Sequence, residues 1–561
     1  MEVLSGYIKH IVFSNRDNGY TVFELDTDTG EITCVGDLHA VSEGENIRLE
    51  GEYVTHSIYG RQFKFSRYEP VEASDELSFY KYLASGAVKG IGPATARKIV
   101  DAFAEDTFKV LEESPEMLAS IKGISLRKAM EISAQFCEKQ EVRRIMVFLQ
   151  KFGISVNLAN KIYERYGDET YKVMAENPYR LAEDITGVGF RTADGIAISA
   201  GVDRHSPYRI RSGIMYTMSV ASSEGHIYLP KEDVERRASD VLEVSGEEIQ
   251  AELEALGMDR RLIMRSVSGD DRVYLPSFYR METACAAMLR DLDIVTETDT
   301  AKIYDTVVRL EDPERPLEEK QRSAVVSSLS NGVSVITGGP GTGKTTIINV
   351  LIKYLDRVGD DFVLAAPTGR AAKRMTEATG YESSTIQRLL GLSPGGPDGR
   401  EFSYEYNEDN PLEVDAVIID EMSMVDLPLF RSLLAALVPG TRLIMVGDTD
   451  QLPSVGPGSV LRDLIASECF SVTKLDRIFR QSDESDIIEN AHKINSGRMP
   501  KLDNKSKDFF MLRRNDADVI IKTMITLVSA KLPGYVNATP FDIQVLTPMR
   551  KGPLGVESLN P

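Results

Sequence analysis

The chain has 561 residues, enough for about three to five domains. Its hydrophobic share of 42% and charged share of 27% are those of an ordinary globular protein, and no apolar run approaches the ~20 residues of a membrane helix. The first residues lack the basic stretch and apolar core of a signal peptide. We therefore expect a cytoplasmic protein without a membrane partner.

The cysteines and the net charge exclude only a few kinds of functional site. Cys34, Cys137, Cys285 and Cys469 stand far apart with no CxxC spacing, which argues against a zinc site, an iron–sulfur cluster or a disulfide framework. The formal net charge is −21. It would argue against nucleic-acid binding only if the basic residues were evenly spread, because contacts with phosphate are local.

Residues 1–72 alternate apolar and polar positions in short segments separated by glycine and asparagine turns. Segments such as "GYTVFELDT" and "RQFKFSRYEP" have the period of half-buried strands. This pattern predicts a small β-barrel of the oligonucleotide-binding (OB) type. A generic β-domain without a ligand is the alternative.

Residues 75–200 predict helices and contain a duplication. "GIGPATARKIVDAF" aligns with "GISVNLANKIYERY", and a second glycine turn follows each of them, "KGIS" and "TGVG". Glycine allows a tight turn, after which the next helix presents its amides to a phosphate. The turns resemble the helix–hairpin–helix motif of DNA-binding proteins, so we expect DNA contacts at Gly90, Gly92, Gly187 and Gly189. A helical packing repeat without DNA contact is the alternative.

Residues 203–310 mix strand-like and helical segments, and we expect an α/β connector there. Beyond about residue 317 strands and helices alternate, and "VSVITGGPGTGKTTIINVL" predicts a strand, a glycine loop and a helix. The loop fits G-x-x-x-x-G-K-T, in which Lys344 reaches the β- and γ-phosphates and Thr345 holds Mg²⁺. We expect ATP and Mg²⁺ as cofactors. The residues expected around the phosphates are Gly339, Pro340, Gly341, Thr342, Gly343, Lys344, Thr345 and Thr346.

Two further strands supply the polar groups that a P-loop needs. "DAVIIDEMSMVD" predicts a buried strand that ends at Asp420, expected to hold Mg²⁺, and Glu421, expected to polarise the attacking water. "RLIMVGDTDQLPSVGPGS" ends near Gln451, which can report whether the γ-phosphate is present. "KLDRIFRQ" offers Arg480 as an arginine finger, with Arg477 as the alternative.

The motifs occur in a familiar order: "GGPGTGKTT", "APTGRAAKRM", "STIQRLL", "VIIDEMSMVD", "VGDTDQLPSVGPG", "RIFRQ" and "QVLTPMRKGPLGVESLN". In this order they resemble the motifs of RecD-like DNA helicases of superfamily 1 (the RecD/TraA family). The β-domain and the hairpin repeats resemble the long-form members, which work without a RecBC complex. The resemblance implies an α/β P-loop ATPase with RecA-like motor domains that moves 5′→3′ on single-stranded DNA and unwinds duplex DNA.

The resemblance also implies roles for single residues. Gln321, on a helix before the P-loop, can read the adenine edge, and Gln387 stands where family members often carry His. The implied catalytic residues are Lys344, Glu421, Gln451 and Arg480. The DNA-binding residues implied by the motor motifs are Pro367, Thr368, Gly369, Arg370, Thr547 and Arg550.

A Gly/Pro-rich entry and the alternation of Phe402, Tyr404 and Tyr406 predict a β-hairpin over 391–414, inserted in the motor. In the family such a hairpin splits the duplex, and a surface loop is the alternative. We expect motor domain 1 over 317–470.

For residues 471–561 we expect the start of motor domain 2, with a strand at 541–548. Later family motifs that read like "AITVHKSQGSE" and "TALTRA" do not occur, so we expect the chain to end inside this domain.

Three functional hypotheses follow from these motifs. The first is an ATP-dependent 5′→3′ DNA helicase acting in DNA repair or recombination. The second is an ATP-gated clamp or annealing factor, or an inactive helicase fragment. The third is a P-loop ATPase that acts on protein or small molecules. The first two imply single-stranded DNA and single-strand/double-strand junctions as partners, with repair or single-strand-binding proteins as further partners.

Overall fold

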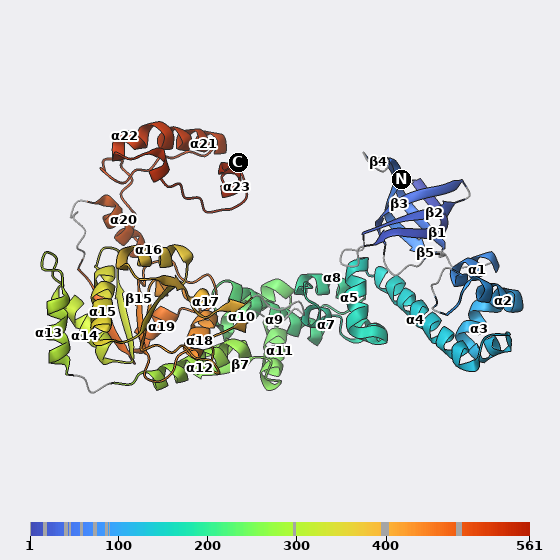
Figure 1. Cartoon of the computed structure of the whole chain (residues 1–561), viewed down its shortest axis with the longest axis horizontal. Helices are drawn as coiled ribbons and strands as arrows, with labels where there is room; N and C mark the ends of the chain where they lie inside the picture. The colour runs from blue at the N-terminus through green and yellow to red at the C-terminus, as the bar shows by residue number, and fades with distance from the viewer. Residues whose placement is uncertain are drawn as a thin grey trace. The chain divides into compact units, whose positions relative to one another are not determined.

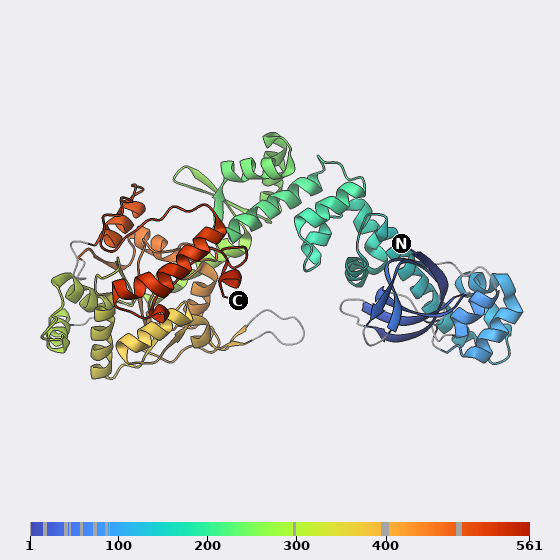
Figure 2. The ribbon, with the colours of Figure 1, turned by 90° about the horizontal axis from the view of Figure 1, so that it is seen from above.

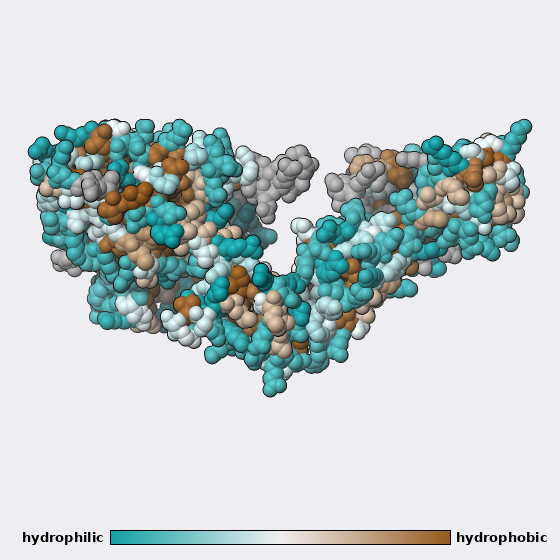
Figure 3. All heavy atoms as spheres, turned by 90° about the horizontal axis from the view of Figure 1, so that it is seen from below, coloured by the Kyte–Doolittle hydropathy of each residue, from teal (hydrophilic) through white to brown (hydrophobic). Residues whose placement is uncertain are grey.

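The computed structural model describes residues 2–14, 20–27, 29–38, 43, 46–56, 60–70, 76–84, 88, 90–295, 299–393, 403–477 and 485–560. The chain divides into two compact units, one of residues 1–283 with 456–458 and one of residues 284–455 with 459–561. Figures 1 and 2 show their ribbons from two sides. On the face drawn in Figure 3 the surface is mainly hydrophilic, and apolar side chains form small separate patches.

The first unit begins with a closed barrel. Its strands are β1 (Glu2–Ser14), β2 (Tyr20–Thr27), β3 (Gly30–Asp37), β4 (Asn46–His56) and β5 (Gly60–Pro70). Their order around the barrel is β1-β2-β3-β5-β4, and β4 pairs with β1 to close it. Alternate strand residues, such as Phe23 and Leu25 on β2, fill the interior completely buried. Five strands closed in this way form the expected OB-type barrel, which is confirmed.

Helix α1 (Glu76–Ala84) leads into two similar helical successions. The first comprises α2 (Pro93–Phe103), η1 (Ala104–Asp106), α3 (Thr107–Glu113), η2 (Pro115–Ser120) and α4 (Leu126–Gln150). The second comprises α5 (Val156–Tyr166), η3 (Gly167–Glu169), α6 (Thr170–Glu176), α7 (Arg180–Asp184) and α8 (Phe190–Ser199). The internal sequence duplication thus corresponds to a repeated order of helices.

The rest of the first unit joins helices to a small sheet. Its elements are α9 (Pro207–Ser223), β6 (Tyr228–Pro230), α10 (Lys231–Leu242), α11 (Gly246–Met258), β7 (Ile263–Val267), β8 (Asp270–Tyr274) and the start of α12 (Pro276–Leu292). The three strands form an antiparallel sheet in the order β6-β8-β7.

A buried ion pair ties this region to the second hairpin copy. The Arg209 guanidinium on α9 donates to both carboxylate oxygens of Asp194 on α8, at 2.9 and 3.2 Å. It also donates to the carbonyl oxygens of Arg204 and Leu242, at 3.0 and 2.9 Å, and the Tyr179 hydroxyl donates to Asp194 at 2.7 Å. The two charged side chains are only 7% and 16% exposed, so this network joins α8, α9 and α10.

The second unit contains a six-stranded parallel sheet. Its strands are β9 (Val333–Gly338), β10 (Phe362–Ala366), β11 (Ser383–Thr385), β14 (Ala416–Ile419), β15 (Arg442–Gly447) and β16 (Ser471–Leu475), in the order β11-β10-β14-β15-β9-β16. β9 and β14 are buried along their whole length, as strands covered on both faces are. The helices of this unit are α13 (Thr300–Leu310), α14 (Glu319–Ser330), α15 (Lys344–Val358), α16 (Gly369–Thr379), α17 (Ile386–Leu389), η4 (Met422–Met424), α18 (Leu427–Ala435) and α19 (Val460–Ser467), which surround the sheet in Figure 1.

The sheet extends one strand beyond the boundary expected at residue 470. β16 (Ser471–Leu475) pairs in parallel with β9, so it completes the first motor domain and does not begin a second. This strand could not be predicted, because "SVTKL" carries no motif and its place depends on pairing with β9.

Residues 485–560 are helical or irregular. Its elements are α20 (Asp486–Asn495), α21 (Ala517–Thr526), η5 (Leu527–Lys531), α22 (Leu532–Val536), η6 (Pro540–Asp542) and α23 (Val556–Leu559). The strand expected at 541–548 is wrong: residues 485–560 contain no strand. A strand is stable only when its backbone groups are paired, and no partner strand lies in this segment. Phe541 and Leu546 of this segment are 100% and 84% exposed.

Among the described helices, the stretch Ala517–Val536 meets the length and composition of a membrane span, with a mean hydropathy of 1.3. None of it is buried in the structure. Asp518, Lys522 and Lys531 interrupt its apolar positions, which is why no apolar run is evident from the sequence. Length and composition by themselves are weak evidence for membrane insertion, since helices of other proteins share them.

The Asp194 network predicts a large stability effect. Asp194→Ala leaves the Arg209 guanidinium buried without its counter-charge, so we expect a loss of about 3–5 kcal/mol in the free energy of unfolding of the first unit. Urea unfolding followed by circular dichroism measures it. The control is Glu131→Ala, which removes the exposed ion pair with Arg127 and costs below about 1 kcal/mol. Equal losses in the two variants would contradict the structural role of Asp194.

Candidate active site and DNA-binding surfaces

The P-loop follows the carboxyl end of β9 and ends at the first turn of α15. The Lys344 ammonium donates to the carbonyl oxygens of Gly338 and Gly339, at 2.6 and 3.3 Å. Gly341 and Gly343 both have φ of +83°, in the left-handed region that suits glycine. The loop therefore curls around the lysine ammonium, in the manner expected for a phosphate-binding loop.

Gln321 braces this loop from α14. Its side chain is 4% exposed, its Nε2 donates to the carbonyl oxygen of Thr342 at 2.9 Å, and its Oε1 accepts from the Glu318 amide at 2.9 Å. Both ends of the amide are thus engaged within the protein. The expected reading of the adenine edge stays a prediction, and the structure gives Gln321 a second role in positioning the P-loop.

The carboxylates at the end of β14 lie close to the lysine. Burial raises the pKa of Asp420, and the positive charge of Lys344 opposes this rise. Burial, and then the charge of Asp420, raise the pKa of Glu421, while Lys344 lowers it. The Glu421 amide donates to Asp420 Oδ1 at 2.8 Å. The structure thus brings the predicted lysine, metal ligand and water-polarising residue together at one edge of the sheet.

Two features mark Glu421 as more than a structural residue. Its φ of +55° is unusual for a residue with a side chain and costs about 1–3 kcal/mol, so it persists only because the surrounding structure imposes it. Its Oε2 and the Ser423 hydroxyl are buried without a hydrogen-bond partner among the described residues. A buried polar atom without a partner costs about 1–3 kcal/mol, so these atoms suit a polar ligand such as water.

The donor set fits a magnesium–nucleotide complex. Asp420 supplies a carboxylate and Thr345 an exposed hydroxyl, and oxygen ligands of this kind are those that Mg²⁺ prefers. The loop glycines allow phosphate oxygens to approach the backbone closely.

The strand β15 lies between β14 and β9, and its end completes the site. Gln451 Nε2 donates to the buried Asp448 carboxylate at 3.2 Å, which holds the proposed phosphate sensor in place. A cavity of about 20 Å³, lined in part by Ser423, Thr449 and Gln451, has room for one water molecule. This cavity lies between the residues that follow β14 and those that follow β15.

Arg374 is a site residue that the sequence reading missed. Its positive charge lowers the pKa of Glu421, so it lies near this carboxylate. It follows Arg370 by four residues on α16, and this spacing places both on one helix face. In the sequence, the four-residue spacing of the two arginines in "GRAAKR" is the feature that could have indicated Arg374.

The two candidates for the arginine finger are Arg480 and Arg477. Arg480 lies outside the described residues, so its role stays a prediction. The alternative, Arg477, forms an ion pair with Glu318 at 3.5 Å, and the neighbouring Asp476 accepts from Lys320 at 2.5 Å. Residues 476–477 are thereby tied to the start of α14.

The predicted DNA contacts of the motor begin at the N-terminus of α16. Thr368 caps this helix by accepting from the Ala371 amide at 3.2 Å, so its hydroxyl is engaged, whereas Pro367 lies beside it and Gly369 is exposed. The exposed Arg370 donates to the Gln544 side chain at 3.0 Å.

The contacts expected beyond β16 have partners within their own segment. Thr547 donates to the Leu554 carbonyl at 2.5 Å, and Arg550 pairs with Glu557 at 3.0 Å. A DNA contact at these two residues stays a prediction.

The inserted hairpin is present at its base. β12 (Leu392–Ser393) pairs antiparallel with β13 (Ser403–Tyr404). Its tip, including Phe402, lies outside the described residues. Splitting of duplex DNA by this hairpin stays a prediction.

The four glycine turns of the first unit fall into two kinds. Gly92 and Gly189 are N-caps without a side-chain cap, and a Cβ built on either would meet no atom within 4 Å. At the other two turns a serine occupies the N-cap, and Ser125 and Ser155 accept from amides of their own helices at 3.2 and 3.4 Å. In the first kind the third helix amide, of Thr95 or Thr192, donates to the carbonyl of the capping glycine at 2.9 or 3.1 Å, and no side chain caps the first turn. The second kind uses its own hydroxyl as the cap.

Gly90 and Gly187 precede the open kind and have φ of +93° and +91°. Only glycine adopts such values without strain, which accounts for the glycine pair in "GIG" and "GVG".

Comparisons with known protein families agree with the fold and the site. Residues 1–73 match "ATP-dependent DNA helicase YrrC, OB-fold domain", and residues 81–135 match "SAM-like Helix-hairpin-helix tandem". Residues 138–228 match "ATP-dependent RecD2 DNA helicase HHH domain", and residues 321–457 match "AAA domain". The expected hairpin and P-loop regions are therefore confirmed.

Individual relatives point to the same family. The chain is 30% identical to the ATP-dependent RecD2 DNA helicase of Deinococcus radiodurans, over 99% of this chain and 77% of the relative. It is 40% identical to the RecBCD enzyme subunit RecD of Mycolicibacterium smegmatis, over 26% of this chain and 30% of the relative.

Among solved structures, the Pif1 helicase of Candida albicans aligns with 38% of this chain and 55% of its own at 22% identity. The TM-score of this alignment is 0.27. The match along almost the whole chain, together with the barrel, the hairpins and the P-loop site, leads to one conclusion: the chain belongs to the RecD2 family of ATP-dependent DNA helicases.

Proposed function

We propose that the protein hydrolyses ATP to move 5′→3′ along single-stranded DNA and to separate duplex strands at junctions. The observation that carries the proposal is the meeting of Lys344, Asp420 and Glu421 at one edge of a parallel sheet. Membership of the RecD2 family supports DNA as the substrate, and the proposed direction rests on the resemblance of the motifs to 5′→3′ helicases.

Each residue at the site has a part in this reaction. Lys344 binds and neutralises the phosphates, and Asp420 with Thr345 would hold Mg²⁺, which supplies charge neutralisation for phosphoryl transfer. Glu421, with its unpartnered Oε2, orients the attacking water and accepts its proton. Gln451, held by Asp448, senses the γ-phosphate. Positioning and charge neutralisation supply most of the rate in such reactions.

Contact with DNA is divided between the two units. In the motor unit, the start of α16 with Gly369 and Arg370 faces the strand. In the first unit, the hairpins at Gly92 and Gly189 hold DNA backbone phosphates on their helix amides. Such contacts carry no sequence information, which suits an enzyme that moves along any sequence.

An ATP-gated clamp that grips DNA without moving is the second candidate. It shares every residue described above, because nucleotide-dependent DNA binding needs the same P-loop. The two candidates differ in strand separation alone.

Replacing the catalytic carboxylate tests the proposed chemistry. Glu421→Gln keeps the size of the side chain and leaves Lys344 and Asp420 in place, so we expect near-normal ATP binding. Hydrolysis stimulated by single-stranded DNA should fall by about 10²–10⁴-fold, the usual contribution of a general base. Fluorescent-nucleotide binding and steady-state phosphate release measure the two effects.

Lys344→Ala is the matched control, because it should weaken nucleotide binding as well as hydrolysis. If Glu421→Gln instead abolished ATP binding, or left hydrolysis within a few-fold of normal, the role given to Glu421 would be wrong.

Serine substitutions at Gly92 and Gly189 test whether these two hairpins bind DNA. Gly92→Ser with Gly189→Ser gives these hairpins the N-cap of their two relatives, and both sites have open space and ordinary φ values of −96° and −91°. Each serine side chain would occupy the open space in front of the first helix turn, through which a phosphate would approach the amides. We expect unchanged or slightly higher thermal stability and about tenfold weaker binding of duplex DNA, at about 0.5–1.5 kcal/mol per lost hydrogen bond.

Gly246→Ser serves as the control, since Gly246 also begins a helix with open space around its Cβ position. Fluorescence anisotropy with a blunt duplex measures the affinity. An unchanged affinity in the double variant would remove the two hairpins from the DNA-binding surface.

A further inference from the structure

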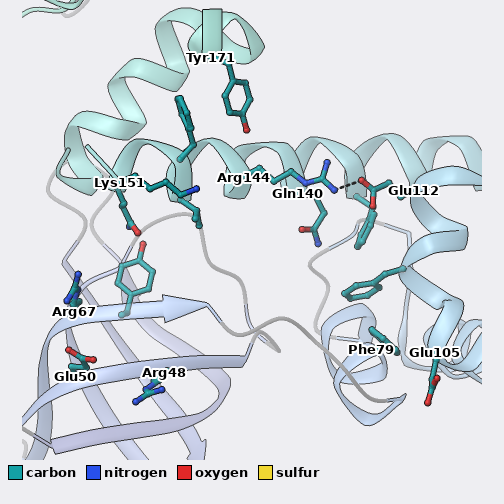
Figure 4. Close-up of a pocket in the computed structure, with 16 residues that line it drawn as sticks. Arg48, Glu50, Arg67, Phe79, Glu105, Glu112, Gln140, Arg144, Lys151 and Tyr171 are labelled. Carbon is teal, nitrogen blue, oxygen red and sulfur yellow. Dashed lines mark hydrogen bonds and ion pairs between the residues drawn. The ribbon is translucent and has the colours of Figure 1, made fainter. Parts of the chain in front are cut away.

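A large groove lies in the first unit, between the barrel and the first helical succession. Its volume is about 1040 Å³, at the upper end of the ~300–1,000 Å³ of small-molecule pockets. One wall is formed by β4 and β5 of the barrel and the other by α3, the C-terminal half of α4 and α6. We call it the barrel–α4 groove, with Arg48, Arg67, Arg144, Lys151, Tyr68 and Tyr171 as its defining residues. Figure 4 shows the two walls facing each other.

Both walls are anchored to the same helix, α1. Lys81 reaches the barrel, where its ammonium lies 3.4 Å from the Asp26 carboxylate and 4.1 Å from the centre of the Tyr7 ring. On its other side, α1 packs Phe79 against Phe108 of α3, with ring centres 4.6 Å apart. The groove is therefore a built feature of this unit.

Basic side chains project from both walls. Arg48 and Arg67 stand on the outer face of the barrel, and Arg144 and Lys151 stand opposite on and just after α4 (Figure 4). Arg144 pairs with Glu112 at 2.5 Å. For Arg48, Arg67 and Lys151, no carboxylate lies within ion-pair distance among the side chains that the structure describes. Three cations thus remain available in a protein with a net charge of −21.

Aromatic rings accompany these cations. Tyr171 points toward α4 (Figure 4), and its ring centre lies 4.8 Å from that of Phe148. Tyr68 of β5 lines the opposite wall and is half-buried. Gln140 and Gln150 add amide groups that can bond to base edges. Separated cations and half-buried rings in one groove suit a single strand, since phosphates pair with the cations and bases stack on the rings.

We propose that the barrel–α4 groove binds a short stretch of single-stranded DNA, separately from the strand held by the motor. An acidic peptide would satisfy the cations but would offer the rings nothing to stack on. The groove lies on β4 and β5, whereas OB folds usually bind through strands 2 and 3. The proposal goes beyond the proposed function, because it needs neither ATP nor movement. A second grip on the strand would keep the protein at its substrate between motor steps.

The absence of tryptophan from the chain allows a selective test. Tyr171→Trp places the only tryptophan of the protein in the groove, so its fluorescence reports stacking of bases at that place. Oligo(dT) of about eight nucleotides is titrated into the nucleotide-free full chain at low salt. We expect quenching that saturates and that weakens as salt rises, because phosphate contacts release counterions.

Charge reversals added to the Tyr171→Trp variant test whether the DNA binds in the barrel–α4 groove. Arg67→Glu with Lys151→Glu should weaken binding at least about tenfold, in keeping with the loss of two phosphate contacts. Lys64→Glu with Lys109→Glu changes the net charge equally at exposed positions of β5 and α3 that do not line the groove. This control should change the affinity less than about twofold if binding is local, since distant exposed charges are screened by salt.

Four results would overturn the proposal. The first is equal weakening of binding by the two charge-reversal pairs, and the second is unchanged fluorescence both in Tyr171→Trp and in a second reporter, Phe148→Trp. The third is tighter binding of a blunt duplex than of oligo(dT). The fourth is a larger fluorescence response to an acidic peptide than to oligo(dT) at the same salt. ATP hydrolysis in the same variants keeps the proposals apart, because loss of the groove leaves the motor site intact.

Discussion

The site depends on the charge of one lysine among buried carboxylates. Asp420 and Glu421 are neighbours at the end of a buried strand, where burial raises the pKa of both. The charge of Asp420 raises the pKa of Glu421 further, and the charge of Lys344 lowers both pKa values. The lysine reaches them because the P-loop curls around its ammonium, with Gly338 and Gly339 accepting its hydrogen bonds. A nucleotide phosphate would take over the lysine from these carbonyls. Binding would thus alter the charge balance that both carboxylates experience.

The order of the strands makes this arrangement possible. β14 and β9 are separated by β15, so the carboxylates, the phosphate sensor and the P-loop follow one another along a single edge. The Gln321 amide fastens α14 to the loop from the other side. A change in the position of one loop therefore displaces the neighbouring loops, and a motor needs such coupling to convert hydrolysis into movement. For the first unit we propose phosphate contacts instead, at the glycine-capped hairpins and at the barrel–α4 groove.

Much of this could be read from the sequence, because local chemistry decides it. A glycine loop between a buried strand and a helix has few other uses, and the alternation in the first 72 residues requires a barrel-like sheet. The glycine-capped and serine-capped turns also differ in sequence, at Gly92 against Ser125.

The parts that could not be read depend on pairing between distant segments. β16 has no motif, and its place is set by β9. The apolar run at 541–548 resembles a strand, but strand formation needs a partner that residues 485–560 do not contain. The barrel–α4 groove joins residues about 100 positions apart, from Arg48 to Lys151, so only the folded unit assembles it.

The most direct test of the account is strand separation on two duplexes that are identical except for the tail. One carries a 5′ single-stranded tail and the other a 3′ tail, each with a trap for the released strand and saturating Mg²⁺ and ATP. The account predicts release from the 5′-tailed duplex alone, and none when Lys344 is replaced by alanine. Equal or faster release from the 3′-tailed duplex would contradict the direction of movement. No release from either duplex, with DNA-stimulated ATP hydrolysis intact, would contradict the helicase and favour the clamp.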